Sequence, residues 1–497
     1  MANKRSYITK SGYLLGVKCE LAFHNWWNKV EAEYSEGAEA VMQAGTDIGK
    51  LAHSLVSDGI DMNLFPDQSP WKLADKTLEL LNKHRAIFEA TFLTKQNPKL
   101  LCKVDILIPD GKGWMIWEVK ATNSVKDEHR EDLAFQYYVL SALGLKITRA
   151  AIVHLNKEYI KNGALDIKQL FTISDQTQVV KNLQDSIQQN IFELVATGKL
   201  EKVPVIPIGS HCSTPYDCPY LYICWKDFPE QDTIYTIPRI GAKADIYLEK
   251  GMFNLSDIDP NILSENQKKI YDAHIANTEI IDKPEIQSFI NGLQFPIHFL
   301  DFETIMPALP IWDGTHTYQQ IPFQYSLHIV QKKGDAPQHF EFLDAALGND
   351  PRIQFIEQLL DDLQSSGTIL VYNKSFEEAR LKEIAIAYPK YENAIIKVIN
   401  RIQDLWIPFR NFWFYHPDMQ GSSSIKKVLP VLVPELSYAN LEIGEGGAAM
   451  NAFLQLLQTD ISKNEKEKVL NDLKEYCKMD TLAMVKILEK LQDIISK

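Results

Sequence analysis

The sequence predicts an α/β fold in two larger domains joined by a short helical connector. Strand-like and helix-like segments alternate in two stretches, near residues 101–155 and near residues 297–390. The chain has 497 residues, more than one compact core usually contains, and 45% of them are hydrophobic against 24% charged. This composition is typical of a globular protein and argues against a disordered or fibrous one. We expect domains at 1–228 and 291–497, with the connector at 229–290.

The charge and the N-terminal residues restrict the partners of the protein. A formal net charge of −13 argues against a broad basic surface that coats nucleic acid, although a local basic groove remains compatible with it. The N-terminus lacks the apolar stretch of a signal peptide, and no run approaches the roughly 20 apolar residues that a membrane span needs. We therefore expect a cytoplasmic protein without a membrane partner.

The clearest pattern of the first domain is a hairpin. The segments KVDILIP and WMIWEVK read as strands around the turn DGKG, residues 128–143 read as a helix, and RAAIVHL reads as a further strand. Glu118 and Lys120 are two residues apart and share one face of their strand, with Asp105 on the partner strand. We expect Asp105 and Glu118 to lie close enough across the ladder to share one cation.

These three residue types suit the hydrolysis of phosphodiester bonds. Two carboxylates can hold Mg²⁺ or Mn²⁺, which activates a water and polarises the phosphate, while the Lys120 ammonium stabilises the developing charge. Such a triplet can also be a solvated strand face. Here it ends a strand of Trp, Met, Ile, Trp and Val, which favours the catalytic interpretation.

The triplet resembles the signature of the PD-(D/E)XK nuclease superfamily, and within it the RecB-like branch. The resemblance implies a restriction-endonuclease-like fold, with His53 of GKLAHSL as a further metal ligand and Gln136 of AFQYYVL as a catalytic residue. The branch usually has a Tyr four residues after the Gln. Leu140 stands at that position, and Tyr138 is a weak substitute.

Four cysteines extend this resemblance. They are Cys19 and the later group Cys212, Cys218 and Cys224. In iron-sulfur RecB-like nucleases one early and three late cysteines hold a four-iron, four-sulfur (4Fe-4S) cluster, and the resemblance assigns all four. Zinc is the competing metal, with His211 as a possible extra ligand, although zinc ligands usually come as closer pairs. Cys102 and Cys477 are expected to be core thiols.

The second domain contains acidic residues on three predicted elements. The strand FPIHFLDFET carries Asp301 and Glu303 on one face, and the strand TILVYN leads into KSFEEARLKEIA, which places Glu377 just past the strand. The last helix carries Tyr476 and Asp480, which are four residues apart and therefore on one face. We expect the four carboxylates to converge on divalent cations.

This order resembles the DEDD exonucleases of the ribonuclease H-like fold, the group that includes the DnaQ-type proofreading enzymes. The resemblance implies removal of nucleotides from a 3′ end, with two cations on the acidic residues and Tyr476 positioning the water. Asn373 matches the family turn, but Glu377 stands where the family has Asp, which puts activity in doubt. Asp404 is read as a structural or supporting residue.

As a whole, the chain resembles an uncharacterised bacterial family in which a RecB-like iron-sulfur nuclease precedes a DnaQ-like exonuclease. The resemblance implies a nuclease of DNA repair or defence, with DNA favoured over RNA. Two alternatives remain open, namely a nucleic-acid-binding protein with one or both centres inactive, and an exonuclease that acts on RNA. The segments GSSSIKK and NFWFYHP are candidates for phosphate contacts and base stacking, although an aromatic cluster is more often core.

Overall fold

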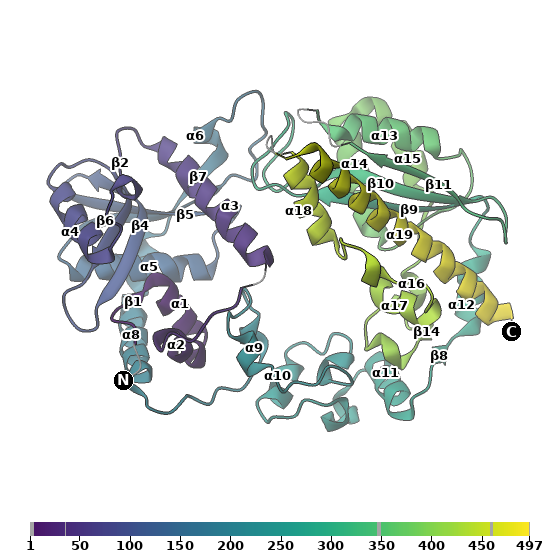
Figure 1. Ribbon diagram of the computed structural model, residues 1–497, viewed down its shortest axis with the longest axis horizontal. Coiled ribbons are helices and arrows are strands. Elements are labelled where there is room, and N and C mark those ends of the chain that lie inside the picture. The colour runs from purple at the N-terminus through teal and green to yellow at the C-terminus, as the bar shows by residue number, and fades with distance from the viewer. Residues whose placement is uncertain (1–3, 35, 345–348, 458–460, 497) are drawn as a thin grey trace. The chain divides into compact units, whose positions relative to one another are not determined.

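The structure, a computed structural model, describes residues 4–34, 36–344, 349–457 and 461–496. The chain divides into two compact units, each built around a mixed β-sheet with helices (Figure 1). Unit 1 comprises Met1–Phe228, Leu248–Gly251 and Ala308–Tyr318, and unit 2 comprises Pro229–Tyr247, Met252–Pro307 and Gln319–Lys497. Most of the expected connector, residues 229–290, therefore packs with unit 2. The α/β class predicted from the sequence is confirmed.

The sheet of unit 1 has seven strands in the order β2-β3-β4-β5-β6-β7, with β1 beside β4. Their bounds are β1 Ile8–Thr9, β2 Ile60–Asp61, β3 Ile87–Leu93, β4 Leu100–Asp110, β5 Gly113–Lys120, β6 Ile147–Leu155 and β7 Phe171–Asp175. The predicted hairpin is β4 and β5, which pair antiparallel, whereas β5 and β6 run parallel. A parallel neighbour requires a crossover, and helix α5 (Asp127–Ala142) supplies it.

The helices of unit 1 pack in one large apolar core and in two smaller apolar clusters. They are α1 Lys10–Lys18, α2 Glu20–Trp27, α3 Glu36–Ala52, α4 Pro70–Leu81, α5, α6 Ile167–Leu170, α7 Thr177–Asn182, α8 Gln184–Lys199 and α9 Leu221–Cys224. Helix α1 follows β1 directly, and the Thr9 side chain caps it by accepting a hydrogen bond from Gly12 N. Because β1 pairs with β4, the first residue of α1, Lys10, is anchored at the sheet.

A segment from later in the chain belongs to unit 1. Residues 308–318 pack there, with Lys161 Nζ 2.6 Å from Asp313 Oδ1. Tyr318 OH donates to the backbone oxygen of Ala121, and Ile160 forms an isolated β-bridge with His316. The strands that precede and follow this segment, β9 (Ile297–Ile305) and β10 (Ile321–Val330), belong to unit 2.

The main sheet of unit 2 has the order β11-β10-β9-β12-β13. The other bounds are β11 Gln338–Leu343, β12 Ile369–Val371 and β13 Ile402–Asp404. Strand β10 pairs antiparallel with both β9 and β11, whereas β12 pairs parallel with both β9 and β13. All residues of β10 and most of β9 are buried, as expected for central strands covered on both faces.

Helices pack on both faces of this sheet. One core holds Leu300 and Phe302 of β9 with side chains of α13 (Pro351–Asp362), α14 (Lys374–Ala387) and α15 (Glu392–Ile399). Another core holds Phe299 of β9 with side chains of α17 (Ile425–Leu432) and α19 (Lys463–Ser496). Alternation along β9 sends its odd and even residues to opposite faces, so Asp301 and Glu303 lie on the α19 face.

Smaller elements complete unit 2. They are α10 Lys243–Leu248, α11 Glu265–Ala276, β8 Ile280–Ile281, α12 Lys283–Asn291, α16 Ile407–Arg410, β14 Phe414–Tyr415 and α18 Gly446–Leu456. Helix α13 ends at Asp362, ahead of the sequence SSG. Within the part of the chain that is described, every helix is too short or too polar to cross a membrane.

Candidate functional site

The N-terminal centre lies where three neighbouring strands each contribute an acidic residue. Asp105 is on β4, Glu118 is on β5, and Glu89, which the sequence reasoning missed, is on β3. Asp105 Oδ2 accepts a hydrogen bond of 2.7 Å from the backbone N–H of Val119, beside Glu118. Ile106 pairs with Trp117, so Asp105 and Glu118 face each other across the hairpin. The structure therefore brings the two predicted carboxylates together.

The carboxylate of Glu118 accepts three hydrogen bonds from side chains. Its Oε1 accepts from Lys120 Nζ at 2.7 Å and from Lys10 Nζ at 2.8 Å. Its Oε2 accepts from Gln136 Nε2 at 2.6 Å. Lys120 was predicted to share a strand face with Glu118, and the two side chains are in contact there, while Gln136 reaches the same carboxylate from α5. Lys10 was not predicted, because it lies 108 residues before Glu118.

Asp132 on α5 connects these donors to each other. Its Oδ2 lies 2.5 Å from Lys120 Nζ, and its Oδ1 lies 3.4 Å from Lys10 Nζ and 2.9 Å from Gln136 Nε2. Asp132 and Gln136 are four residues apart and so occupy one face of the helix. The sequence contained a signal for Asp132, namely its position four residues before the predicted Gln.

The lysines determine the charge state of this centre. Burial and the neighbouring Asp105 raise the pKa of Glu118, but Lys10 and Lys120 outweigh them, so its pKa is lowered overall. For Lys120, burial lowers the pKa while Asp132 and Glu118 raise it, and the net pKa is raised. The pKa of Asp105 is raised, chiefly by burial, with Lys10 opposing. Glu118 and the two lysines are therefore charged at neutral pH.

The backbone of Glu89 is unusual for a strand residue. Its φ is 56°, in the left-handed region, and it lies between the register pairs Phe88 with Ile106 and Ala90 with Val104. A non-glycine residue in this region costs free energy and is often found at functional sites. The strain supports the assignment of this sheet region as a site.

His53, the predicted further metal ligand, lies beside Glu89. It sits in a short 3-10 turn after α3, with Nε2 4.0 Å from Glu89 Oε1 and its ring stacked on Phe88 at 4.2 Å. Burial lowers its pKa, and Nε2 is buried without a hydrogen-bond partner among the described residues. A neutral imidazole with an unused nitrogen is suited to metal binding. Leu140 is a core residue, and Tyr138 packs against the same core.

The four predicted cysteines are brought together in unit 1. Cys19, Cys212, Cys218 and Cys224 line one small cavity with His211, and all are free thiols. His211 Nε2 lies 3.6 Å from Cys212 Sγ. Burial and the other three thiols raise the pKa of Cys224 to about 11. Cys102 is buried in the main core, as predicted.

The C-terminal centre contains the tightest group of acidic side chains. Asp301, Glu303 and Asp480 each offer a carboxylate oxygen, and these oxygens lie within 4.8 Å of one another. Among the described residues, no other group of three or more His, Cys, Asp or Glu side chains has its ligand atoms this close together. The first two come from β9 and the third from α19, as the sequence predicted.

Glu377 lines the same cavity, of about 210 Å³, but is not part of that close group. It lies in the first turn of α14, only 1% exposed, and its Oε2 is buried without a hydrogen-bond partner among the described residues. Asn373 precedes this helix with a φ of 89° and donates its backbone N–H to Asp404 Oδ1 at 3.0 Å. Asp404 therefore supports the turn that presents Glu377, in agreement with its predicted supporting role.

Two tyrosines and a lysine surround Asp480. Tyr476 lines the cavity one helical turn before Asp480, as predicted. Tyr438, which the sequence reasoning missed, donates its hydroxyl to Asp480 Oδ1 at 2.7 Å. Lys426 lies over both rings, 5.5 Å from the centroid of Tyr476 and 5.9 Å from that of Tyr438. Lys426 belongs to the predicted GSSSIKK segment.

Burial is the main cause that raises the pKa of the acidic residues of this centre, and Asp480 further raises the pKa of Asp301 and Glu303. Burial and then Asp480 raise the pKa of Glu303 to about 8, with Lys426 opposing. Burial raises the pKa of Asp480 to about 6 and that of Glu377 to about 8. The pKa of Asp301 is raised by burial and by the three other acidic residues. A divalent cation would relieve this repulsion, so the donors present fit a cation such as Mg²⁺ or Mn²⁺.

Cys477 is buried, as predicted, and lies at the rim of this group. Its Sγ is 3.9 Å from the backbone oxygen and from Oδ2 of Asp301. The aromatic cluster NFWFYHP belongs to a core of unit 2, with Phe414 and Tyr415 buried in it. The alternative that these rings form core is therefore confirmed.

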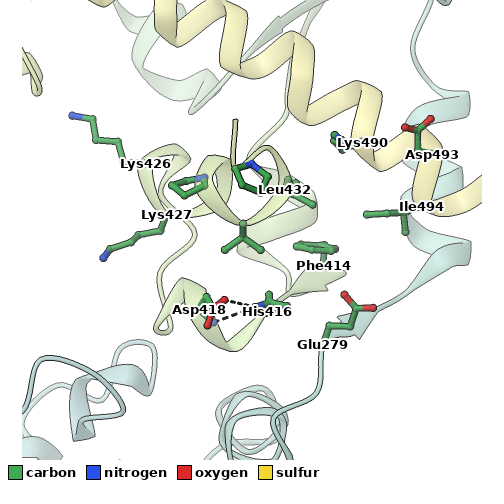
Figure 2. A pocket seen from close by; sticks show the side chains of 13 residues that line it. Glu279, Phe414, His416, Asp418, Lys426, Lys427, Leu432, Lys490, Asp493 and Ile494 are labelled. Carbon is green, nitrogen blue, oxygen red and sulfur yellow. Dashed lines mark hydrogen bonds and ion pairs between the residues drawn. The ribbon is translucent and has the colours of Figure 1, made fainter. Parts of the chain in front are cut away.

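A larger cavity of about 800 Å³ lies beside α17 in unit 2 and shares Lys426 with the acidic cavity. Figure 2 shows Lys426 and Lys427 on α17 and Lys490 and Asp493 on α19. The lining contains three lysines (Lys426, Lys427, Lys490) and three acidic residues (Glu279, Asp418, Asp493). Its charges are balanced, so electrostatics do not select an anionic ligand.

Comparison with known proteins yields relatives without an assigned activity. Residues 298–424 match the model of a domain of unknown function (DUF2779). The chain is 29% identical to the uncharacterised protein MG366 of Mycoplasma genitalium, over 40% of this chain and 32% of that protein. It is 26% identical to the uncharacterised protein UU173 of Ureaplasma parvum, over 85% of this chain and 80% of that protein. The match therefore spans about a third of MG366 and most of UU173.

One solved structure, described as the crystal structure of SSO0001, aligns with 45% of this chain and 88% of its own. The identity is 13% and the TM-score is 0.20. A likeness at this level carries no weight in the interpretation of either centre.

Proposed function

We propose that this chain is a metal-dependent nuclease with two centres, each of which hydrolyses phosphodiester bonds of nucleic acid. The observation that carries the proposal is the convergence of Asp301, Glu303 and Asp480 within 4.8 Å. Oxygen ligands lie about 2.1 Å from Mg²⁺, so carboxylate oxygens at such separations suit shared coordination of one cation. The finer folds proposed are restriction-endonuclease-like for unit 1 and ribonuclease H-like for unit 2.

In the C-terminal centre the three carboxylates would hold the cation, with Glu377 as a more distant fourth acidic residue. A bound Mg²⁺ or Mn²⁺ would activate the attacking water and stabilise the leaving oxygen. Tyr476 would orient the water, and Tyr438 holds Asp480 ionised by donating to it. Hydrolysis adds water to phosphorus and breaks the bond to the leaving nucleotide oxygen, which takes up a proton. We propose 3′-end removal of nucleotides, with DNA preferred over RNA.

In the N-terminal centre Asp105, Glu118 and His53 would hold the cation, and Lys120 would contact the phosphate or the water. The unused nitrogen of His53 and its neighbour Glu89 support this arrangement. A specific observation favours a second candidate function for this centre, namely binding without cleavage. Both oxygens of Glu118 accept hydrogen bonds from protein donors, which a cation would have to displace.

Cleavage of matched DNA and RNA single strands tests the proposal. We expect Mn²⁺-dependent release of nucleotides from the 3′ end, and a loss on the order of 10³ in rate for Asp301→Asn because a cation ligand is removed. Asp361→Asn, an exposed exchange of the same kind on α13, serves as the control. Cleavage that survives in the Asp301→Asn, Glu118→Gln double variant would contradict the proposal, and absence of cleavage with retained binding would favour the binding function.

We propose a 4Fe-4S cluster on Cys19, Cys212, Cys218 and Cys224. The four thiols share one cavity, and burial together with the other three thiols raises the pKa of Cys224 to about 11. Oxygen-free purification should give a brown protein whose broad visible absorbance is lost in Cys212→Ala and kept in Cys102→Ala. A colourless protein that carries zinc would replace the cluster by the alternative metal.

A further inference from the structure

Lys10 and Asp132 have no role in the function proposed above, yet they are bound into the N-terminal centre. Lys10 Nζ is 2.8 Å from Glu118 Oε1 and 3.4 Å from Asp132 Oδ1. The side chains of Glu118 and Asp132 are each only 2% exposed. Burying charged groups costs free energy even when they are paired, so a network of this kind is not explained by stability alone.

The two lysines of the centre have almost the same surroundings. Lys120 is 2.7 Å from the same Glu118 oxygen and 2.5 Å from the other oxygen of Asp132. The exposed fractions of the two side chains are 22% for Lys10 and 21% for Lys120, whereas the acidic partners are inaccessible. Among the four side chains of this network, the parts that solvent reaches therefore belong to the two lysines.

Lys10 and Asp132 change the position of the charges in the centre but not its net charge. Lys10 and Asp132 add one positive and one negative group to the predicted triplet of Asp105, Glu118 and Lys120, so the net charge of the centre is unchanged. The addition changes where the charge lies, because Asp132 is buried while Lys10 reaches the surface. Two ammonium groups held on one carboxylate oxygen repel each other, and a tetrahedral oxyanion can bind between them.

We infer that Lys10 and Lys120 together form an ammonium pair that binds the phosphate group to be cleaved, and that Asp132 is the positioning residue that holds the pair. The inference rests on the proposed function of the N-terminal centre and deepens it by naming the group that receives the substrate phosphate. Asp132 anchors each ammonium through a separate oxygen, and Gln136 fixes Asp132 and Glu118 to each other. The position of Lys10 directly after β1 keeps its backbone in place.

The test uses the full chain with Asp301→Asn, so that cleavage by the C-terminal centre is removed. In this background Lys10→Met should lower kcat/KM for a single-stranded DNA oligonucleotide at least about tenfold, because a charge-assisted hydrogen bond to phosphate is lost. Lys10→Arg, which keeps the charge, should recover part of the loss. Lys112→Met is the matched control, because Lys112 is an exposed lysine in the turn between β4 and β5.

Inhibition by inorganic phosphate distinguishes phosphate binding by Lys10 from a merely structural role. Phosphate should inhibit the parent protein by competition, and both Lys10→Met and Asp132→Asn should raise its inhibition constant about fivefold or more. Binding of Mn²⁺ alone, measured by titration, should remain in Lys10→Met. Unchanged cleavage and unchanged phosphate inhibition in Lys10→Met would overturn the inference.

Failure of the proposed function gives a different pattern. One possible outcome is that the Asp301→Asn protein does not cleave DNA and that adding Glu118→Gln leaves Mn²⁺ binding unaltered. The N-terminal centre is then not a metal nuclease, and the ammonium pair is wrong as well. If the protein cleaves and loses activity on Glu118→Gln but not on Lys10→Met, only the ammonium pair is wrong. Thermal unfolding of each variant separates loss of the fold from loss of the site.

Discussion

The two centres gather the same kind of side chain but neutralise it in different ways. In the N-terminal centre Glu118 receives two ammonium groups and an amide from the protein itself, and its pKa is lowered. In the C-terminal centre the pKa of Glu303 is raised to about 8 and that of Asp480 to about 6, with Lys426 as an opposing charge. The acidic residues of the first centre are compensated by two lysines of the chain, whereas Glu303 and Asp480 in the second have Lys426 as their opposing charge.

The largest expected effect is that one substitution in each centre changes the free energy of unfolding in opposite directions. Glu118→Gln should lower the free energy of unfolding of the cation-free protein by about 3 kcal/mol, because two half-buried lysines lose their shared partner. Asp301→Asn should raise it by about 1 kcal/mol, because repulsion among buried carboxylates is relieved. Calorimetry can follow both, since the two units need not unfold in one step. If both substitutions changed the free energy of unfolding in the same direction, the contrast drawn between the two centres would be wrong.

The exposed exchanges Glu158→Gln and Asp361→Asn serve as controls for this pair. Glu158 is in unit 1, with a side chain that is 80% exposed, and Asp361 is in unit 2. Surface substitutions away from special features usually change stability by less than about 0.5 kcal/mol. A large effect in either control would show that charge alone, rather than its place in a centre, determines the outcome.

A second expected effect is a pH-dependent stabilisation by cations that the C-terminal centre dominates. A carboxyl with a raised pKa favours folding at low pH, and this contribution is lost as pH rises from its ordinary value near 4.5 to about 8 for Glu303 and Glu377. A cation must displace these protons, so it binds better at pH 8 than at pH 6. Saturating Mn²⁺ should raise the melting temperature by about 5 °C at pH 8 and less at pH 6.

The control for this effect is a variant with fewer acidic side chains. Asp301→Asn together with Glu303→Gln should remove most of the extra gain at pH 8, because the remaining acidic residues attract the cation less strongly. The same measurement on Glu118→Gln should leave that gain nearly intact. If the pH dependence disappeared in Glu118→Gln, the cation effect would belong to the N-terminal centre, which would contradict this prediction.

The smallest expected effect concerns Tyr438. Its hydroxyl donates to Asp480 and thereby favours the ionised carboxylate, which lowers the pKa of Asp480. Tyr438→Phe should move the acidic limb of the pH–rate profile to higher pH and lower the rate at pH 7 roughly threefold to tenfold. Tyr476→Phe should have a larger effect on the maximal rate. An unshifted acidic limb in Tyr438→Phe would contradict this role.

Local patterns in the sequence predicted the strands and the residues that lie on them. The period of two placed Glu118 and Lys120 on one face, and a helical spacing of four placed Tyr476 and Asp480 together. Both outcomes follow from the nearest neighbours in the chain, so no tertiary information was needed. The hairpin of β4 and β5 was predictable for the same reason, because a short turn joins its strands.

The missed residues reach their sites through long-range contacts. Lys10 meets Glu118 only because β1 pairs with β4, and nothing in a two-residue strand signals that pairing. Tyr438 meets Asp480 from a loop 42 residues earlier. The left-handed backbone of Glu89 is also set by the surrounding sheet and has no mark in a single sequence. Such contacts depend on the register of distant segments, which a local pattern does not specify.

The segment 308–318 has a practical consequence for how the protein can be dissected. A fragment that stops at residue 228 would lack the hydroxyl of Tyr318 on Ala121 and the carboxylate of Asp313 near Lys161. Ala121 directly follows Lys120, so the missing segment contacts the chain at the end of strand β5. A half-length N-terminal fragment that proved insoluble or inert would therefore say little about the chemistry of its centre. Silencing one centre by point substitution keeps the interleaved chain whole.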